Sequence, residues 1–316
     1  MKILFVEKPS MELRSERACL LIYQQGQRIG SVPLKELERV VVTPQVVLTS
    51  GVLGVFGEYG ITLLVLNHRY PDRSAMLTGA MHGDVHRRMR QYARYQDRAF
   101  RSRQAQTLLL AKLTRQYRLI SRQLFARPDL RHVLTKSLIT LLHQLKALQQ
   151  ADESWELDQL RGLEGAAAAY FAGYSRLFAP SLGFEHRHRR PPTDPVNACL
   201  SLSYTLLHQE AVEALRTVGL DSELGCFHDL YYQRDSLACD LLEPIRPWID
   251  AWVYQLFHKH CLRLEDFERR DGGCWLQPAG KRRFYETYRQ KVLVFRRLLR
   301  QYARIAEKTV MSDEPQ

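Results

Sequence analysis

The sequence has few cysteines, and the six that it has form no CxxC pair. In a chain of 316 residues they do not suggest the disulfide framework of a small secreted domain, so reduced thiols are expected. No apolar run approaches the roughly 18 residues that a membrane-spanning helix needs. The first residues, MKILFVEKPS, carry a glutamate and a proline too early for a secretory signal peptide. We therefore expect a soluble cytoplasmic protein with no membrane partner.

Acidic residues are scarce relative to basic ones. The chain has 46 lysines and arginines against 34 aspartates and glutamates, which gives a formal net charge of +12. Because neutralised phosphates supply most nonspecific nucleic-acid affinity, this excess makes a polyanionic partner plausible. A basic surface without a partner is the alternative.

Many of the basic residues lie in the segment 84–125, where apolar residues recur at helical spacing and predict one long helix. Asp84 is placed to cap this helix, and Pro128 follows its end. Since Asp84 and Asp97 are its only acidic residues, we favour a phosphate-binding face over a solvated face paired with distant acids. The arginines predicted to contact DNA here are Arg87, Arg88, Arg94 and Arg98.

The N-terminal part of the sequence predicts strands. Short segments rich in valine, isoleucine and leucine alternate with glycine, proline or charged breaks. The predicted strands are 2–7, 18–24, 27–34, 39–44, 46–50 and 61–68, with a short helix at 50–60. Residues 1–78 are therefore expected to form a small β-rich domain, followed by a hinge at 79–83.

Beyond residue 83 the pattern becomes helical. Besides the long basic helix, helices are expected near 130–150, 156–178, 197–218, 236–258 and 281–307. We predict an α+β chain in which the small β-rich domain precedes a larger all-helical domain at 84–305. Residues 306–316 are expected to be a disordered tail.

Two isolated polar residues in the helical part are candidates for chemistry. Glu164 lies in the run LRGLEGAAAAYFAGY, whose small residues allow close helix packing, although a surface glutamate on an alanine-rich helix is the alternative. His228 follows Gly225 and is bracketed by Asp229 and Asp235. A structural loop histidine is the alternative interpretation there.

The segment YYQRDSLACDLLEPIRPW at 231–248 adds two acids. A helix capped by Asp235 or Ser236 would place Asp240 and Glu243 on one face, one turn apart. Pro244 and Pro247 should break that helix, and Pro244 should push Glu243 out of helical geometry and aim its side chain into a cavity. The alternative is an ordinary helix end, with EPIRP linking to a new helix near Trp248.

Two carboxylates and one imidazole suit a divalent cation such as Mg²⁺ or Mn²⁺. Zinc is the alternative metal, because Cys226 and Cys239 lie close to His228 and Asp240 in the sequence. His186 and His188, in the run EHRHRR, could bind a metal or contact phosphates.

Several motifs together resemble one family. LRGLEGAAAAYFAGY, RRPPTDPVNACLSLSYTLLHQEAVEAL and GLDSELGCFHDLYYQRDSLACDLLEPIRP follow the β-rich start in the same order as in the CRISPR-associated spacer-acquisition integrases. The resemblance covers nearly the whole chain. One departure is Arg115, where the family often has asparagine.

The resemblance implies a metal-dependent DNA endonuclease and integrase whose helical domain is catalytic. It implies Glu164, His228 and Glu243 as metal ligands and Asp240 as a nearby catalytic acid. Family members dimerise through the β domain and assemble with a small second CRISPR-associated adaptation protein. The complex joins the 3′-hydroxyls of double-stranded prespacer DNA to the repeat array.

The attacking group in such a reaction is the DNA 3′-hydroxyl, so the protein needs no nucleophile of its own. Arg189 and Arg190 are candidates for holding the DNA backbone near the site, and Arg246 could serve this role or pair with local acids. Two other functions stay open: a non-catalytic basic DNA-binding scaffold, and a zinc hydrolase.

Overall fold

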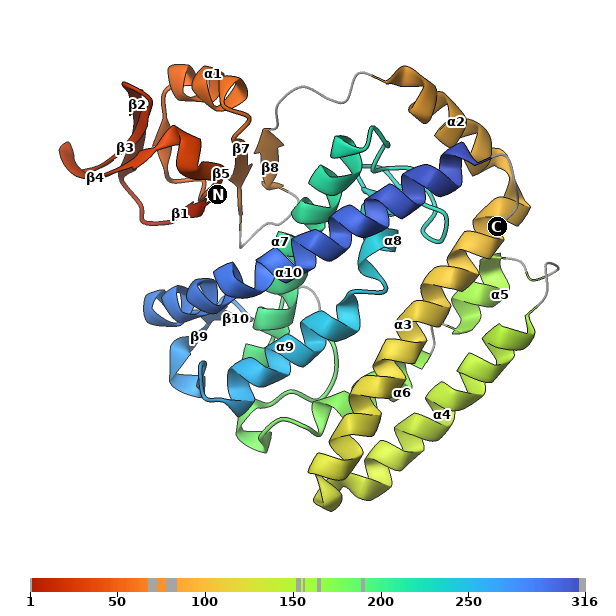
Figure 1. The fold of residues 1–316 in the computed structure, drawn as a ribbon. Helices are drawn as coiled ribbons and strands as arrows, with labels where there is room; N and C mark the ends of the chain where they lie inside the picture. Colours follow the sequence, from red (N-terminus) through yellow and green to blue (C-terminus); the bar gives the residue numbers. More distant parts are fainter. Residues whose placement is uncertain are drawn as a thin grey trace. The chain divides into compact units, whose positions relative to one another are not determined.

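The computed structural model describes residues 2–67, 73–77, 84–151, 155, 157–163, 166–188 and 191–312. The chain divides into two compact units, Met1–Gly83 and Asp84–Gln316 (Figure 1). No helix among the described residues is long and apolar enough to cross a bilayer.

Within its described residues, the first unit contains two four-stranded sheets and one α-helix. The first sheet has the order β1-β5-β7-β8, in which β8 is antiparallel to β7 and the other neighbours are parallel. Its strands are β1 (Lys2–Val6), β5 (Leu37–Val42), β7 (Thr62–Val65) and β8 (Ala75–Leu77). The second sheet has the order β4-β3-β2-β6. It contains β2 (Met11–Glu16), β3 (Cys19–Gln24), β4 (Gln27–Pro33) and β6 (Val47–Leu48).

One hydrophobic core joins both sheets of this unit to α1 (Ser50–Glu58). Leu13 and Leu20 reach it from the second sheet, Val40 and Val42 from β5, and Phe56 from α1. β5 is central in its sheet and almost wholly buried, which explains its continuous valine run. The sequence did not predict β2, because Leu13 is the only buried residue in a strand of alternating charged and apolar side chains.

The second unit is mostly helical, as predicted. Its helices are α2 (Val85–Gln96), α3 (Arg98–Ala126), α4 (Arg131–Gln150), α5 (Leu157–Gly162), α6 (Ala166–Ser175), α7 (Pro195–Thr217), α8 (Ser236–Leu242), α9 (Arg246–His258) and α10 (Pro278–Met311). A hairpin of β9 (Phe267–Arg270) and β10 (Gly273–Leu276), which the sequence did not predict, precedes α10. Short 3₁₀ turns occur at Leu34–Glu36, Pro128–Leu130, Pro180–Leu182 and Leu264–Asp266.

The predicted single basic helix is two helices. Asp84 caps α2 by accepting a hydrogen bond from the His86 backbone N–H, as expected. Asp97 then ends α2 and caps α3, where its carboxylate accepts from the Phe100 N–H at 3.0 Å. The acid at position 97 therefore restarts the helix, which the apolar periodicity alone did not reveal.

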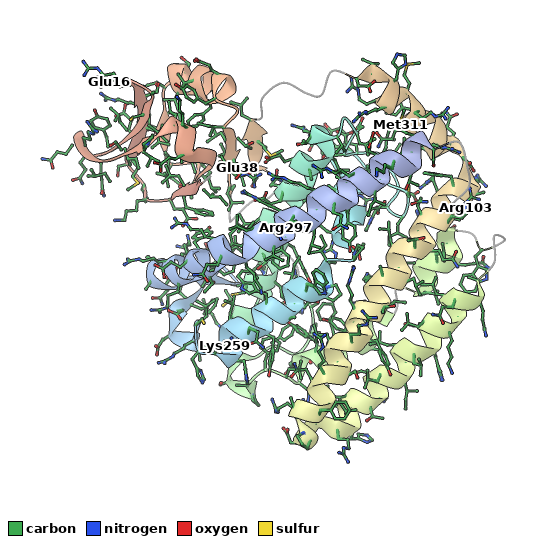
Figure 2. All side chains as sticks on the ribbon, in the orientation of Figure 1. Glu16, Glu38, Arg103, Lys259, Arg297 and Met311 are labelled. Carbon is green, nitrogen blue, oxygen red and sulfur yellow. The ribbon has the colours of Figure 1, made fainter. Side chains whose placement is uncertain are left out.

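The last helix extends further than predicted. α10 continues through Met311, which is labelled in Figure 2, so residues 306–311 of the expected disordered tail are helical. A buried stripe that includes Leu299, Ala303 and Val310 explains the extension. Arg296 of the same helix is buried and forms two hydrogen bonds, 2.6 and 2.8 Å long, with Glu210 of α7.

Candidate active site

The candidate site forms around the loop between α7 and α8. Gly219 follows the end of α7 with φ +80°, a left-handed conformation that glycine adopts readily, and turns the chain away from the helix. The backbone N–H of Leu237, in the first turn of α8, donates to the Ser222 carbonyl at 2.8 Å. Residues 222–237 thus form a closed loop, which carries His228.

Asp240 organises this loop from α8. Its carboxylate is buried and accepts hydrogen bonds from three successive backbone N–H groups, those of Cys226 (2.6 Å), Phe227 (3.0 Å) and His228 (3.1 Å). The Nδ1 atom of His228 lies 2.6 Å from the same carboxylate. Four donors compensate the cost of burying the charge. Because Nδ1 faces a carboxylate, we assign the ring proton to Nδ1, which leaves the lone pair of Nε2 available.

Gly225 is required for this close packing. A Cβ atom at position 225 would lie 2.8 Å from the His228 carbonyl oxygen, 2.8 Å from the Ser236 carbonyl carbon and 2.9 Å from Oδ2 of Asp240. Two of these neighbours are backbone atoms, which cannot move aside as a flexible side chain can. Any larger residue would therefore displace the loop from Asp240.

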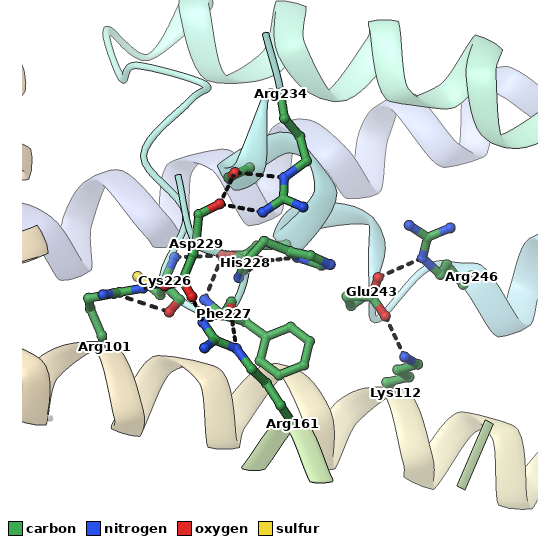
Figure 3. Close-up of polar contacts among 12 residues, drawn as sticks. Arg101, Lys112, Arg161, Cys226, Phe227, His228, Asp229, Arg234, Glu243 and Arg246 are labelled. Carbon is green, nitrogen blue, oxygen red and sulfur yellow. Dashed lines mark hydrogen bonds and ion pairs between the residues drawn. The ribbon is translucent and has the colours of Figure 1, made fainter. Parts of the chain in front are cut away.

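Asp229 fixes the other side of the loop to two helices (Figure 3). Arg101 of α3 lies 2.6 Å and Arg161 of α5 lies 2.7 Å from its carboxylate oxygens. Arg161 also donates to the Phe227 carbonyl at 2.9 Å. Partial burial would raise the pKa of Asp229, but the hydrogen bonds from the two arginines lower it. Position 228 is thus held from α3, α5 and α8 together.

At the two prolines the structure has the alternative arrangement, in which one helix ends and a new helix begins near Trp248, so the single kinked helix expected over 236–258 is two helices. α8 ends at Leu242 and α9 begins at Arg246. The Asp240 carbonyl accepts the Glu243 N–H at 3.1 Å, and the Pro244 carbonyl accepts a hydrogen bond from Arg115 at 2.7 Å. Glu243 itself has φ −52° and ψ −48°, so the prediction that Pro244 would move it out of helical geometry is wrong. Glu243 keeps helical backbone angles, and a turn at residues 243–245 connects α8 to α9.

The predicted side-chain cap of α8 is also wrong. Asp235 occupies the N-cap position but makes no capping hydrogen bond. Its carboxylate accepts instead from the Ser222 hydroxyl at 2.5 Å, and the Ser236 hydroxyl donates to the Asp229 carbonyl at 2.7 Å. Both side chains therefore close the His228 loop rather than cap the helix.

Glu243 lies between two cations (Figure 3). The Lys112 Nζ atom from α3 is 2.6 Å from Oε2, and the Arg246 Nε atom is 2.7 Å from Oε1. Burial opposes ionisation of Glu243, but Arg246, Lys112 and His228 favour it, and the pKa of this carboxyl lies well below its usual range. Glu243 is therefore ionised at neutral pH. Arg246 pairs with this acid, which supports the second of its two predicted roles.

Arg246 connects the site to a buried tyrosine–aspartate network. Its guanidinium lies 4.8 Å from the ring centroid of Tyr204, whose hydroxyl donates to Asp250. The Tyr170 hydroxyl donates to the same carboxylate at 2.8 Å. Burial raises the pKa of Asp250 to about 6, although these hydrogen bonds and the charges of Arg246 and Arg187 oppose the rise.

Replacing Asp250 with asparagine should change how stability depends on pH. Folded Asp250 keeps its proton up to about pH 6, whereas an aspartate in the unfolded chain loses it near pH 4. Because one pKa unit corresponds to about 1.4 kcal/mol, this group lowers stability by roughly 3 kcal/mol as pH rises through that range. Denaturant titrations measure the free energy of unfolding of Asp250→Asn and of the wild type at each pH. The difference, variant minus wild type, should therefore increase between pH 4 and pH 7. Parallel curves would refute the assignment.

The donor chemistry of the site fits a divalent cation. His228 presents Nε2 from a fixed ring, and Figure 3 shows its side chain directed toward the ionised Glu243. Within the described residues, no group of three or more histidine, cysteine, aspartate or glutamate side chains is arranged to hold a metal. Glu164, the third predicted ligand, lies outside the described residues. In sequence it follows α5, whose Arg161 binds the His228 loop.

Two of the arginines predicted to contact DNA are engaged within the second unit. Arg87 lies 3.1 Å from Asp84 and 3.5 Å from Glu307, and it donates to the Val218 carbonyl at 2.8 Å. Arg94 donates to the Ser312 carbonyl. These contacts tie α2 to the ends of α7 and α10.

The other predicted DNA contacts stay predictions. Arg98 is exposed at the start of α3 and Arg88 is half-buried. Arg189 and Arg190 lie outside the described residues. The rings of His186 and His188 have centroids 4.3 Å apart.

Three residues that contact the site are far from it in the sequence, and the sequence alone did not assign them to it. Lys112, Arg101 and Arg161 contact loop residues far along the chain, so no local motif marks them. Lys112 did carry one signal. It falls between Leu109 and Leu113 on the buried face of α3, where a lysine is unusual unless an acid compensates it.

Comparisons with known proteins agree over nearly the full chain. The model of the family "CRISPR associated protein Cas1" matches residues 4–290. The chain is 35% identical over 300 residues to the CRISPR-associated endonuclease Cas1 1 of Thermodesulfovibrio yellowstonii, with 92% of each chain covered.

Two solved structures share the fold. A casposase bound to integration product has a TM-score of 0.80 at 19% identity, with 99% of this chain and 92% of the casposase covered. A Cas6-RT-Cas1–Cas2 complex has a TM-score of 0.82 at 18% identity, and the match covers 98% of this chain and 35% of that one.

Proposed function

The chain belongs to the CRISPR-associated Cas1 family, and on that premise we propose that it is a divalent-metal-dependent DNA endonuclease and integrase of CRISPR adaptation. In this proposal it joins the 3′-hydroxyl ends of a prespacer to the repeat array by phosphodiester transesterification. The observation that carries the proposal is the fixed imidazole of His228, held by Asp240 and directed toward a buried, ionised Glu243.

We assign Glu164, His228 and Glu243 as ligands of one Mg²⁺ or Mn²⁺ ion. When bound, such an ion polarises the scissile phosphate and lowers the pKa of the attacking hydroxyl. Asp240 keeps the proton of His228 on Nδ1, so that Nε2 can act as a ligand. Lys112 keeps Glu243 ionised until a cation or a phosphate enters the site.

The proposal includes DNA and protein partners. Double-stranded prespacer and repeat DNA fit the net charge of +12, with Arg88, Arg98, Arg189 and Arg190 as proposed contacts. A Cas2 protein is the proposed assembly partner, because a Cas1–Cas2 complex contains the same fold. We also propose a homodimer through the β-rich unit, whose edge strands expose Ile29 and Val47. The proposed location is the cytoplasm, where free cysteines stay reduced.

The zinc-hydrolase alternative is less favoured. Burial raises the pKa of the Cys226 thiol strongly and that of Cys239 to about 11. Both thiols are then protonated at neutral pH, whereas zinc binds thiolates.

Chelation separates the integrase from a DNA-binding scaffold. We expect the purified chain with Cas2 to join prespacer DNA to a repeat-bearing plasmid in Mn²⁺ or Mg²⁺, and to lose joining in EDTA. DNA affinity measured at the same ionic strength should stay within about twofold, because phosphate contacts by arginine need no metal. Joining that persists in EDTA would contradict the proposal, and the absence of joining in every metal would favour the scaffold.

A further inference from the structure

The His228 loop ends in an exposed apolar tip that the catalytic assignment does not use. Leu230, Tyr231 and Tyr232 are 52%, 72% and 83% exposed, and they directly follow Asp229, which Arg101 and Arg161 hold in place. Transfer of an aromatic ring from water into a contact is favourable, so two adjacent exposed tyrosines indicate a contact surface.

The tip has a fixed conformation. The Arg234 N–H donates to the Tyr231 carbonyl at 3.0 Å, and the Arg234 guanidinium donates to the Asp229 carbonyl. That guanidinium also lies 5.5 Å from the centroid of the Tyr231 ring. Gln233 adopts φ +55°, a left-handed conformation that residues with side chains adopt only at a cost. The surrounding contacts thus maintain a strained turn that leaves both rings in solvent.

The backbone at both tyrosines is close to the backbone at His228. Tyr231 and Tyr232 are three and four residues from His228, so their Cα atoms lie within about 11 and 14 Å of its Cα. Successive bases in a stacked strand are about 3.4 Å apart. The distance from the reacting phosphate to a base a few nucleotides away is of the same size as these separations.

We propose that Tyr231 and Tyr232 form a stacking surface for unpaired nucleobases of the strand whose end reacts at His228 and Glu243. The inference rests on the proposed integrase function and adds a contact that holds the strand end. Nucleobases fit the tip better than a protein side chain, since every base offers a flat face to an aromatic ring and Arg234 supplies a cation beside it. Such stacking is tolerant of sequence, because every base has a flat face.

The test uses the full chain in EDTA, so that no reaction occurs, and DNA duplexes with a short 3′ overhang that carries 2-aminopurine at successive positions. Stacking should quench the fluorescence at one or two positions near the 3′ end. The double variant Tyr231→Leu/Tyr232→Leu should lose this quenching and bind the overhang DNA about tenfold more weakly, since stacking on one or two rings contributes to that order. Its affinity for blunt duplex should not change.

Two variants control the result. Tyr231→Phe/Tyr232→Phe keeps the rings and should retain quenching and affinity. Phe125→Leu removes a ring that is 83% exposed at the end of α3 and should have no effect. Unchanged quenching and affinity in the leucine double variant would overturn the stacking proposal, as would loss of Cas2 binding in place of DNA binding. If wild-type protein still joins DNA in Mn²⁺ in either case, the integrase function stands without this contact.

Discussion

Replacement of His228 by alanine is expected to abolish strand joining while DNA affinity stays within about twofold of the wild-type value. The variant removes the proposed nitrogen ligand, whose position is fixed by contacts from α8, α3 and α5. Loss of one preorganised electrostatic contact at an active site costs roughly a hundredfold to a thousandfold in rate, so a loss of at least that size is expected here. Gel-based joining assays in Mn²⁺ and anisotropy titrations in EDTA measure the two quantities.

His132→Ala provides the matched control, because His132 is an exposed histidine on α4, outside the candidate site. It should join DNA at the wild-type rate. Wild-type activity in His228→Ala would exclude the imidazole from the catalytic site. Glu243→Ala should lose joining as well, but it also leaves the buried Lys112 without its acid, so its thermal stability must be compared first.

Replacement of Asp240 by asparagine is expected to weaken Mn²⁺ binding by about tenfold to a hundredfold and to slow joining at least as much. An amide keeps the shape of the carboxylate, but its NH₂ group cannot accept hydrogen bonds from the N–H donors that surround it. One or more buried donors lose their partner, which costs about 1–3 kcal/mol of stability. The His228 ring is then free to change its tautomer.

Metal affinity distinguishes a role of Asp240 in positioning His228 from a general loss of protein stability. Asp240→Asn should show the weaker Mn²⁺ binding in calorimetric titrations at a temperature where it is fully folded. Asp158→Asn, which alters an exposed partner of Arg161, should bind Mn²⁺ as the wild type does. Wild-type metal affinity combined with lost joining would show that Asp240 does not act through His228.

Local chemistry in the sequence was enough to locate the break between α8 and α9. Two prolines within four residues remove backbone donors, and no tertiary contact can restore them. The geometry at Glu243 was not predictable in the same way. Its helical conformation depends on a turn that Arg115 of α3 supports by donating to the Pro244 carbonyl, and Arg115 is 129 residues away in the sequence.

The partners of the two acids Asp240 and Glu243 also could not be predicted from the local sequence. The spacing of Asp240 and Glu243 suggested one acidic face, yet the structure gives the two acids different partners. Asp240 receives the loop N–H groups and His228, whereas Glu243 is paired with Lys112 and Arg246. Charges that arrive from other helices decide such differences, and they become visible only when the helices are packed.

Binary patterning was similarly incomplete at the ends of elements. The polar residues near 306–311 suggested a disordered tail, because the few apolar positions there are widely spaced. In the structure Val310 is buried and α10 continues to Met311. The strand β2 was missed for the related reason that a single buried leucine sets its register.

The central claim is that His228 and Glu243, with Glu164, hold one divalent cation. The most direct measurement is anomalous diffraction at the manganese absorption edge from crystals of the full chain grown with Mn²⁺. We predict one strong anomalous peak within coordination distance of Nε2 of His228 and of carboxylate oxygens of Glu243 and Glu164. An anomalous peak elsewhere, with no peak at these atoms, would contradict the claim. So would the absence of any peak at a saturating Mn²⁺ concentration that supports joining in solution.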